Sequence, residues 1–214
     1  IGLVGLSISA AAQEITLEDI WKKGTVRQKS VYGIRSTSDG NHYTIQGQSE
    51  DGNTVTMYEY ATGDEVKQVM SEAGLKDISG DGEATFSSYE FNADDKFMLL
   101  KYDVESIYRR SSISKYWIVD LDNREARKLK EKGKQRNATF SPDGSKIAYV
   151  EGNDLFIQDY KTGETTQVTN DGEKNKIING YADWVYEEEF AFSKAFFWSP
   201  DGSKIAYYRT DESE

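Results

Sequence analysis

The residues best suited to bind a charged ligand lie between positions 183 and 190. The segment reads Asp-Trp-Val-Tyr-Glu-Glu-Glu-Phe, so three consecutive carboxylates stand among aromatic residues. Adjacent carboxylates repel one another, and holding them against an apolar surface costs free energy unless a cation pairs with them. Asp183 can cap a short helix that carries the three glutamates. The segment is a candidate site for a cationic group or, on composition alone, a solvated acidic helix face.

Residues for autonomous catalysis are missing from the sequence. The single histidine, His42, has no neighbouring motif that would orient it as the base of a serine triad. The sequence has no cysteine, no Gly-x-Ser-x-Gly elbow and no Gly-rich phosphate loop. Residues 77–82 have a calcium-like spacing, but the twelfth loop position is Ser88 where a glutamate is required. We interpret that segment as a tight turn before a strand, and we expect no metal and no cofactor.

The elements that must position the acidic segment are predicted by a repeated turn. The sequence Ser-Pro-Asp-Gly-Ser-Lys-Ile-Ala-Tyr occurs at residues 141–149 and again at 199–207, with weaker copies at 37–40 and 91–100. The spacing of about fifty to sixty residues is typical of propeller blades with long hairpins. In each full copy the proline presets the first turn angle and the glycine accepts the left-handed conformation that closes a hairpin.

Four such units predict an all-β fold, an incomplete β-propeller of antiparallel four-stranded blades with a short helical insertion that carries the acidic segment. A capping box formed by Thr16 and Asp19 predicts a short helix at the N-terminal side. The last copy stops soon after its turn, which would leave a sheet edge unpaired. We therefore expect the sequence to be part of a longer protein. The strands that we expect cover residues 54–60, 65–69, 146–150, 154–159 and 165–169.

Composition and charge restrict the partners. With 37% hydrophobic and 13% aromatic residues, a chain of 214 residues can bury a core. The net charge of −11 argues against nucleic acid and anionic membranes and favours a cationic ligand.

Residues 1–12 are an apolar run ending in three alanines, which predicts a signal-peptide remnant and export, although an ordinary apolar strand or helix has the same composition. Residues 13–35 are then a lead-in segment and residues 36–214 the partial propeller.

Taken with Asn-Gly at 179–180 and Trp-Ser-Pro at 198–200, the acidic segment closely resembles the propeller of the dipeptidyl peptidase IV branch of the prolyl oligopeptidase family. The resemblance implies that Glu188 and Glu189 bind the free α-ammonium of a peptide. Residues 99–121 resemble, without gaps, the family stretch that bears a substrate-facing arginine. That arginine falls on Arg109, whose planar donors suit a peptide carbonyl. Arg110 beside it departs from the family pattern, and the gapless register favours Arg109.

The resemblance also implies what the whole protein does. It would be an exported bacterial serine exopeptidase, periplasmic or at the cell surface, that removes Xaa-Pro or Xaa-Ala dipeptides from peptides with a free N-terminus. Its catalytic residues would lie in an α/β-hydrolase domain outside this sequence, so no catalytic residue is expected here, and the family resemblance allows a homodimer. The alternatives are a prolyl tripeptidyl peptidase of the same family and a non-catalytic peptide-binding or scaffold propeller.

Overall fold

The structure is a computed structural model that describes residues 15–25 and 32–213. The chain divides into two compact units, residues 1–32 and residues 33–214. In the first unit the predicted short helix is confirmed as α1, Leu17–Trp21. The hydroxyl of Thr16 caps it by accepting from the backbone N–H of Asp19, and the carboxylate of Asp19 accepts from the backbone N–H of Thr16, which completes the capping box. The predicted signal remnant, residues 1–12, lies outside the described residues.

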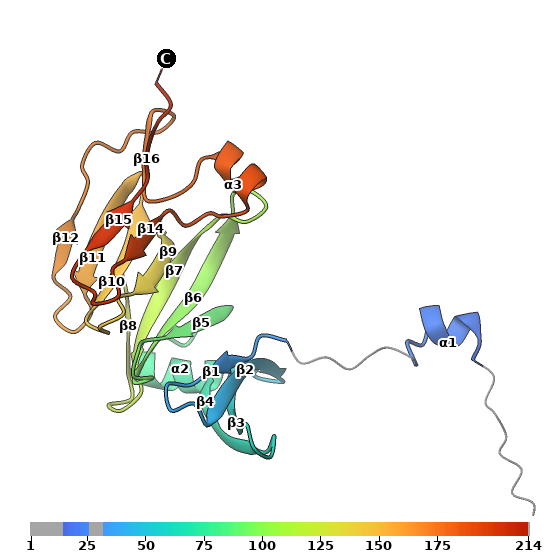
Figure 1. Ribbon diagram of the computed structural model, residues 1–214. Coiled ribbons are helices and arrows are strands. Elements are labelled where there is room, and N and C mark those ends of the chain that lie inside the picture. The colour runs from blue at the N-terminus through green and yellow to red at the C-terminus, as the bar shows by residue number, and fades with distance from the viewer. Residues whose placement is uncertain (1–14, 26–31, 214) are drawn as a thin grey trace, which may run out of the picture. The chain divides into compact units, whose positions relative to one another are not determined.

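The second unit is built mainly from antiparallel sheets that follow one another along the chain, as Figure 1 shows. Three of these sheets have four strands, each paired with the strand before it in sequence. This architecture confirms an all-β fragment of a β-propeller with four-stranded blades. The first sheet contains β1 (Arg35–Ser36), β2 (His42–Ser49), β3 (Gly52–Glu59) and β4 (Glu65–Ser71); the second β5 (Ser88–Phe91), β6 (Phe97–Ser106), β7 (Ser112–Asp120) and β8 (Glu125–Lys128); the third β9 (Arg136–Phe140), β10 (Lys146–Glu151), β11 (Asp154–Asp159) and β12 (Thr165–Gln167).

The repeated turn joins the first strand of each unit to the second. In the third sheet the backbone N–H of Gly144 donates to the carbonyl of Ser141 at 2.9 Å, and Gly144 has a φ of 66°. The hydroxyl of Ser141 donates to Asp143 at 2.6 Å, and this bond is the main reason that the pKa of Asp143 is lowered. Asp201 makes the corresponding bond with Ser199, and the same cause lowers its pKa to about 2. The predicted turn chemistry is confirmed in both full copies.

The fourth copy of the turn lies between β14 (Phe196–Trp198) and β15 (Ile205–Tyr207), which form a two-stranded sheet. A second two-stranded sheet pairs β13 (Ile177–Asn179) with β16 (Arg209–Asp211). Between β13 and β14 lies α3, Trp184–Phe190, the predicted helical insertion. In the described residues the four-stranded plan therefore holds for the first three copies, whereas the fourth has one hairpin, β14–β15, and a separate pair of distant strands, β13 and β16.

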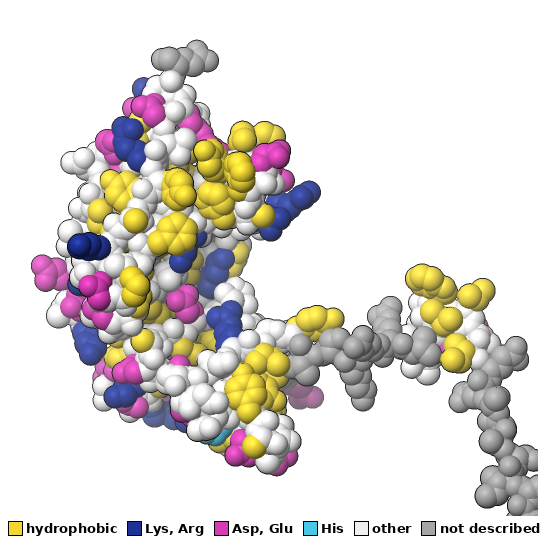
Figure 2. Space-filling model, in the orientation of Figure 1, with side chains coloured by type: hydrophobic (Ala, Val, Ile, Leu, Met, Phe, Trp, Pro, Cys, Tyr) yellow, Lys and Arg dark blue, Asp and Glu magenta, His cyan; other side chains and the backbone are white. Residues whose placement is uncertain are grey.

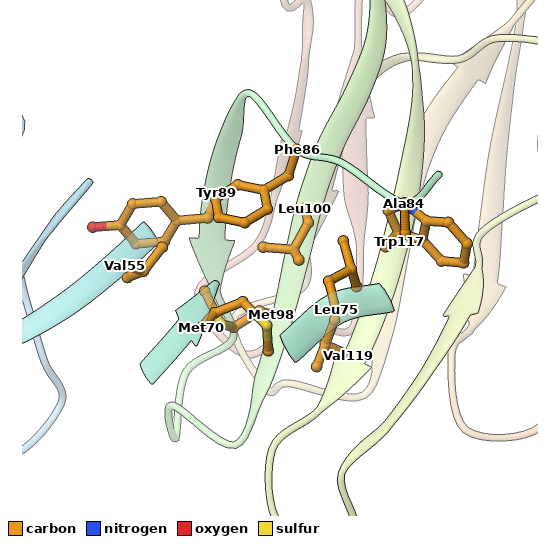
Figure 3. Packing of buried hydrophobic residues seen from close by; sticks show 10 residues of the cluster. All are labelled: Val55, Met70, Leu75, Ala84, Phe86, Tyr89, Met98, Leu100, Trp117 and Val119. Atoms are coloured by element: carbon orange, nitrogen blue, oxygen red, sulfur yellow. The ribbon is translucent and has the colours of Figure 1, made fainter. Parts of the chain in front are cut away.

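One helix was not predicted. Residues 72–79 form α2, Glu72–Ser79, capped by Ser71 and ended by Gly80 in the left-handed conformation. The interpretation of residues 77–82 as a tight turn is therefore wrong for its first half, because the segment begins inside this helix. Leu75 of α2 is fully buried and belongs to the core that α2 forms with the first and second sheets, shown in Figure 3. The other members of this core are Val55, Met70, Ala84, Phe86, Tyr89, Met98, Leu100, Trp117 and Val119.

Tyr160 connects the second and third sheets. Its ring packs edge-on against Phe97 of β6 and Phe140 of β9, with centroids 4.7 and 5.4 Å away. Its hydroxyl donates to the carbonyl of Gly144 and accepts a hydrogen bond from Asn92 of the preceding repeated turn. Two consecutive turns are thus bound to one buried side chain, which fixes the second sheet against the third. No helix in the part of the chain that the structure describes is long and apolar enough to cross a membrane.

Candidate functional site

Helix α3 begins at the cap that the sequence predicts. The side chain of Asp183 accepts a hydrogen bond from the backbone N–H of Tyr186 at 2.7 Å, which satisfies one of the free donors at the helix start. Ala191 takes the left-handed conformation that ends the helix. Residues in an α-helix are rotated by about 100° from one to the next. Glu187, Glu188 and Glu189 therefore point in three different directions.

Glu187 points inward and is the one buried residue of α3, with 1% of its surface exposed. One of its oxygens, Oε1, accepts two hydrogen bonds, from the backbone N–H groups of Arg110 at 2.6 Å and Ser111 at 2.9 Å. Both donors lie in the loop between β6 and β7. This carboxylate therefore binds the loop to the helix, as the proximity of the β6–β7 tip to α3 in Figure 1 also shows.

Glu188 and Glu189 lie on the outer side of the helix. The Oε2 atom of Glu188 is 3.7 Å from Nη1 of Arg109, and the two side chains are 27% and 73% exposed. Glu189 is exposed and makes no hydrogen bond or ion pair with any residue that the structure describes. The structure thus brings Arg109 and Glu188 together from distant parts of the chain. Glu189, the next residue of the helix, is exposed to solvent.

The β6–β7 hairpin carries Arg109 at its tip. The register of the two strands shifts between Tyr102 and Glu105, where Asp103 has a positive φ of 48°. Lys115 and Lys134 donate to the two oxygens of Asp103 at 2.8 and 2.9 Å, and these bonds lower the pKa of the Asp103 carboxyl. Such a bulge bends a strand pair locally. The irregular stretch is fixed by two cations, which supports the hairpin below its tip.

The tip itself is closed by a hydrogen bond from the N–H of Ile107 to the carbonyl of Ser111, at 2.9 Å. Arg110, the neighbour that departs from the family pattern, is exposed and contributes its backbone N–H to Glu187. Arg109 contributes its side chain. The two adjacent arginines therefore have different roles in the structure, and it is the guanidinium of Arg109 that lies near the acidic helix.

The surface around α3 is aromatic. Trp184, Tyr186 and Phe190 are exposed, and the rings of Tyr186 and Phe190 lie 5.2 Å apart. Figure 2 shows hydrophobic side chains gathered over α3 and over β14 and β15, with acidic and basic side chains beside α3. A cavity of about 720 Å³ is lined in part by Tyr108 and Trp184. Charged groups that can bind the ends of a ligand therefore adjoin an aromatic surface that can contact its apolar parts.

The arrangement offers both acceptors and donors. Two carboxylates can accept the three N–H donors of an ammonium group, and a guanidinium can donate to a carbonyl or carboxylate oxygen. An exposed ion pair such as Arg109–Glu188 contributes little to stability, because water screens it and both side chains lose freedom. Breaking the ion pair therefore costs little, and Arg109 and Glu188 can each bind a ligand group instead.

The other candidates from the sequence do not assemble into a site. His42, expected to have no orienting partner, has one, since its Nδ1 lies 2.6 Å from Oδ2 of Asp39. This contact lies within the turn that joins β1 to β2, where Asp39 also accepts from the hydroxyl of Thr37. Among residues 15–25 and 32–213, no group of three or more His, Cys, Asp or Glu side chains is placed to hold a metal ion.

Sequence reasoning missed the role of Glu187. Three adjacent glutamates are alike in composition, and only the phase of the helix decides which one is buried. The cap at Asp183 was the available signal, because it fixes where the helix starts, but the direction of the core was not available from the sequence. Arg136 of β9 was also missed. Burial lowers the pKa of its guanidinium, and the nearby charges of Tyr181, Glu187 and Tyr108 act in the opposite direction.

Comparisons with known proteins agree on one family. Residues 92–214 match the model described as "Dipeptidyl peptidase IV (DPP IV) N-terminal region". The prolyl endopeptidase FAP of Bos taurus is 33% identical over 210 residues, which cover 97% of this chain and 26% of that protein. The dipeptidyl peptidase 4 of Felis catus is 32% identical over 209 residues, which cover 93% and 25%.

A solved structure is similar over nearly the whole chain. The crystal structure of Porphyromonas gingivalis dipeptidyl peptidase 4 superimposes with a TM-score of 0.77 and 34% sequence identity. The match covers 95% of this chain and 28% of that one. The chain thus spans about a quarter of the length of the curated relatives that it matches.

Proposed function

The chain belongs to the dipeptidyl peptidase IV family, whose N-terminal region it carries, and from this we propose that it is the substrate-recognition propeller of a serine exopeptidase. The complete protein removes Xaa-Pro or Xaa-Ala dipeptides from peptides with a free N-terminus. This part binds and orients the peptide, and an α/β-hydrolase domain of the same protein supplies the serine, histidine and aspartate. Export to the periplasm or cell surface belongs to the same proposal and rests on the composition of residues 1–12.

The observation that carries the proposal is the meeting of Arg109 with the acidic helix. The guanidinium of Arg109 stands 3.7 Å from Glu188, and Glu189, the next residue of α3, is exposed. An α-ammonium has three N–H donors, which two carboxylates can accept through charge-assisted hydrogen bonds. The first carbonyl of the same peptide can accept from Arg109. One positive and two negative groups thus offer complementary partners for the charged start of a peptide chain.

Such an anchor explains both where the peptide is cut and how the propeller assists the reaction. A chain that continues past the ammonium site would place a neutral amide against two carboxylates. Its carbonyl finds no donor there, and its single N–H cannot replace the three donors of an ammonium, so internal sequences are rejected. Fixing the N-terminus also sets which peptide bond reaches the catalytic serine. Positioning of this kind lowers the entropic part of the activation barrier without any chemistry by the propeller itself.

The name of one relative also suggests a second candidate function, an endopeptidase. The bovine relative is named a prolyl endopeptidase, which describes cleavage inside a chain. A tripeptidyl peptidase would place its catalytic serine one residue further from the same anchor, and a scaffold propeller would bind the amine without cleavage. The ammonium anchor favours an exopeptidase over an endopeptidase, because an internal segment has no charge to bind there.

Products of a defined peptide distinguish these functions. We would incubate the full-length protein with a peptide that has proline at its second position, and with an N-acetylated copy of it, and identify the fragments by mass spectrometry. The expected result is release of the N-terminal dipeptide from the free peptide only. A tripeptide product would indicate the tripeptidyl peptidase, and cleavage of the acetylated copy the endopeptidase. No cleavage of either peptide would contradict a peptidase and support the scaffold.

A further inference from the structure

We infer that Glu187 is a positioning residue for peptide binding, because it holds the Arg109 tip of the β6–β7 hairpin at a fixed distance from Glu188. The inference rests on the proposed function, since it assigns how the proposed binding groups keep their spacing. Glu187 does not face the ligand side of α3. It acts through the two residues that do the binding.

Only one peptide unit separates the residues bonded through Glu187 from each of the two binding residues, Glu188 and Arg109. Glu187 precedes Glu188 in α3, and its Oε1 atom accepts from Arg110 at 2.6 Å and from Ser111 at 2.9 Å. Arg110 follows Arg109 directly. Neighbouring Cα atoms are about 3.8 Å apart, so each binding residue is one peptide unit from the bonded pair. Any change in the Glu187 bonds therefore moves Arg109 relative to Glu188.

The ion pair between Arg109 and Glu188 cannot set this spacing by itself. Its atoms are 3.7 Å apart, and the Arg109 side chain is 73% exposed. Exposed pairs of this kind are weak and mobile. The bonds of Glu187 differ in kind, because one carboxylate oxygen accepts two backbone N–H groups in a place where water is excluded. Ser111 is buried as well, so the bonded end of the loop is enclosed.

The second oxygen of the Glu187 carboxylate, Oε2, is buried and has no hydrogen-bond partner among the described residues, so nearby positive charge is its remaining compensation. Arg136 of β9 lies close enough for its pKa to respond to the charge of Glu187. The same guanidinium stacks on the ring of Tyr181, 4.2 Å from its centroid. Glu187 thus joins the hairpin of the second sheet to the acidic helix, and Arg136 of the third sheet contributes only its nearby charge. A side chain that served only to stabilise α3 would not have to bind residues 110 and 111.

The test uses full-length protein and the substrate Gly-Pro-p-nitroanilide. Glu187→Ala removes both bonds, and we expect kcat/KM to fall by about 10-fold or more, mainly through a higher KM. Glu187→Gln keeps an oxygen that accepts both N–H groups, and we expect it to stay within about 3-fold of the wild type. The rate of inactivation by diisopropyl fluorophosphate, which needs the catalytic serine but no ammonium, should be unchanged in both variants.

Glu72→Ala is the matched control. Glu72 is also a buried carboxylate and accepts from Asn53 at 2.7 Å, but it belongs to α2 beside the first sheet. We expect this variant to lose stability and keep its KM. If Glu187→Ala yields too little folded protein, Glu187→Asp replaces it. The shorter side chain must lose a bond or pull the tip inward, and an unchanged KM in this variant would overturn the inference.

A double substitution separates positioning from general destabilisation. If Glu187 acts through Arg109, Glu187→Ala should lower kcat/KM by less than about 3-fold once Arg109 is replaced by alanine. Fully additive effects would overturn the inference. The proposed function fails separately, since it requires that Glu188→Gln and Glu189→Gln impair turnover. Impairment by those two substitutions with wild-type kinetics for Glu187→Ala would leave the proposed function in place and reject the positioning role.

Discussion

Adjacent residues of the same type have different environments in this site. Of three consecutive glutamates, Glu187 is buried, Glu188 is partly covered beside a guanidinium and Glu189 is exposed. The two arginines at the hairpin tip differ in the same way, because Arg110 is held by its backbone and Arg109 reaches the helix with its side chain. The chemical role of each residue follows from the direction that its backbone imposes.

The arginine pair can be tested with two matched variants of the full-length protein. Arg109→Met should lower kcat/KM for Gly-Pro-p-nitroanilide by about 10- to 100-fold, because a hydrogen bond from a charged donor to the peptide carbonyl is lost. Arg110→Met should change it by less than about 2-fold, since the backbone N–H that Glu187 binds is still present. Steady-state kinetics measures both. Equal losses in the two variants would show that the charge of the tip matters and not the position of Arg109.

At the scale of elements, the repeated turns were predictable and the pairing around them was not. The order of serine, proline, aspartate and glycine determines a hairpin locally, and the structure has one at each full copy. Helix α2 escaped prediction because its polar sequence carries Gly74 and resembles a turn. The pairing of β13 with β16 joins two three-residue strands far apart in sequence, for which no local signal exists.

The difference between local signals and long-range contacts also explains how much of the candidate site could be predicted. The capped helix, its glutamates and Arg109 were found from the residues and their family resemblance. The bonds of Glu187 to residues 110 and 111 were not predicted, because they depend on the distance between the tip of the β6–β7 hairpin and α3, which are far apart in sequence. Caps and turns can be predicted from neighbouring residues, whereas contacts between elements depend on how the sheets pack.

The turn aspartates make a prediction about acid stability. The pKa of Asp143 is lowered in the folded protein, mainly by the hydroxyl of Ser141, so its charge stabilises the fold above the unfolded pKa of about 3.9. This contribution is lost as the pH falls through the folded pKa. The wild type should therefore unfold at a higher temperature than Asp143→Asn at pH 6, and the difference should shrink towards pH 3. A difference that stays constant or grows on acidification would contradict this role.

At the scale of the whole molecule, our proposal assigns recognition and chemistry to different parts of the protein. Three sheets in series, joined through side chains such as Tyr160, hold α3 and the β6–β7 tip in place. The chain spans about a quarter of its curated relatives, and in our proposal the remainder supplies the catalytic residues. In our proposal the propeller selects and positions the peptide, and the hydrolase domain breaks the bond.

The most direct test of this account is the preference for a substrate with a free amine. We would measure kcat/KM of the full-length protein for Gly-Pro-p-nitroanilide and for its glycolyl-Pro analogue, in which a hydroxyl replaces the amine. The wild type should prefer the amine by about 100-fold or more, and the Glu188→Gln, Glu189→Gln double variant should keep less than about a 10-fold preference. Because both substrates undergo the same reaction, their ratio is insensitive to the amount of folded enzyme. A preference that survives the double substitution unchanged would contradict the ammonium anchor.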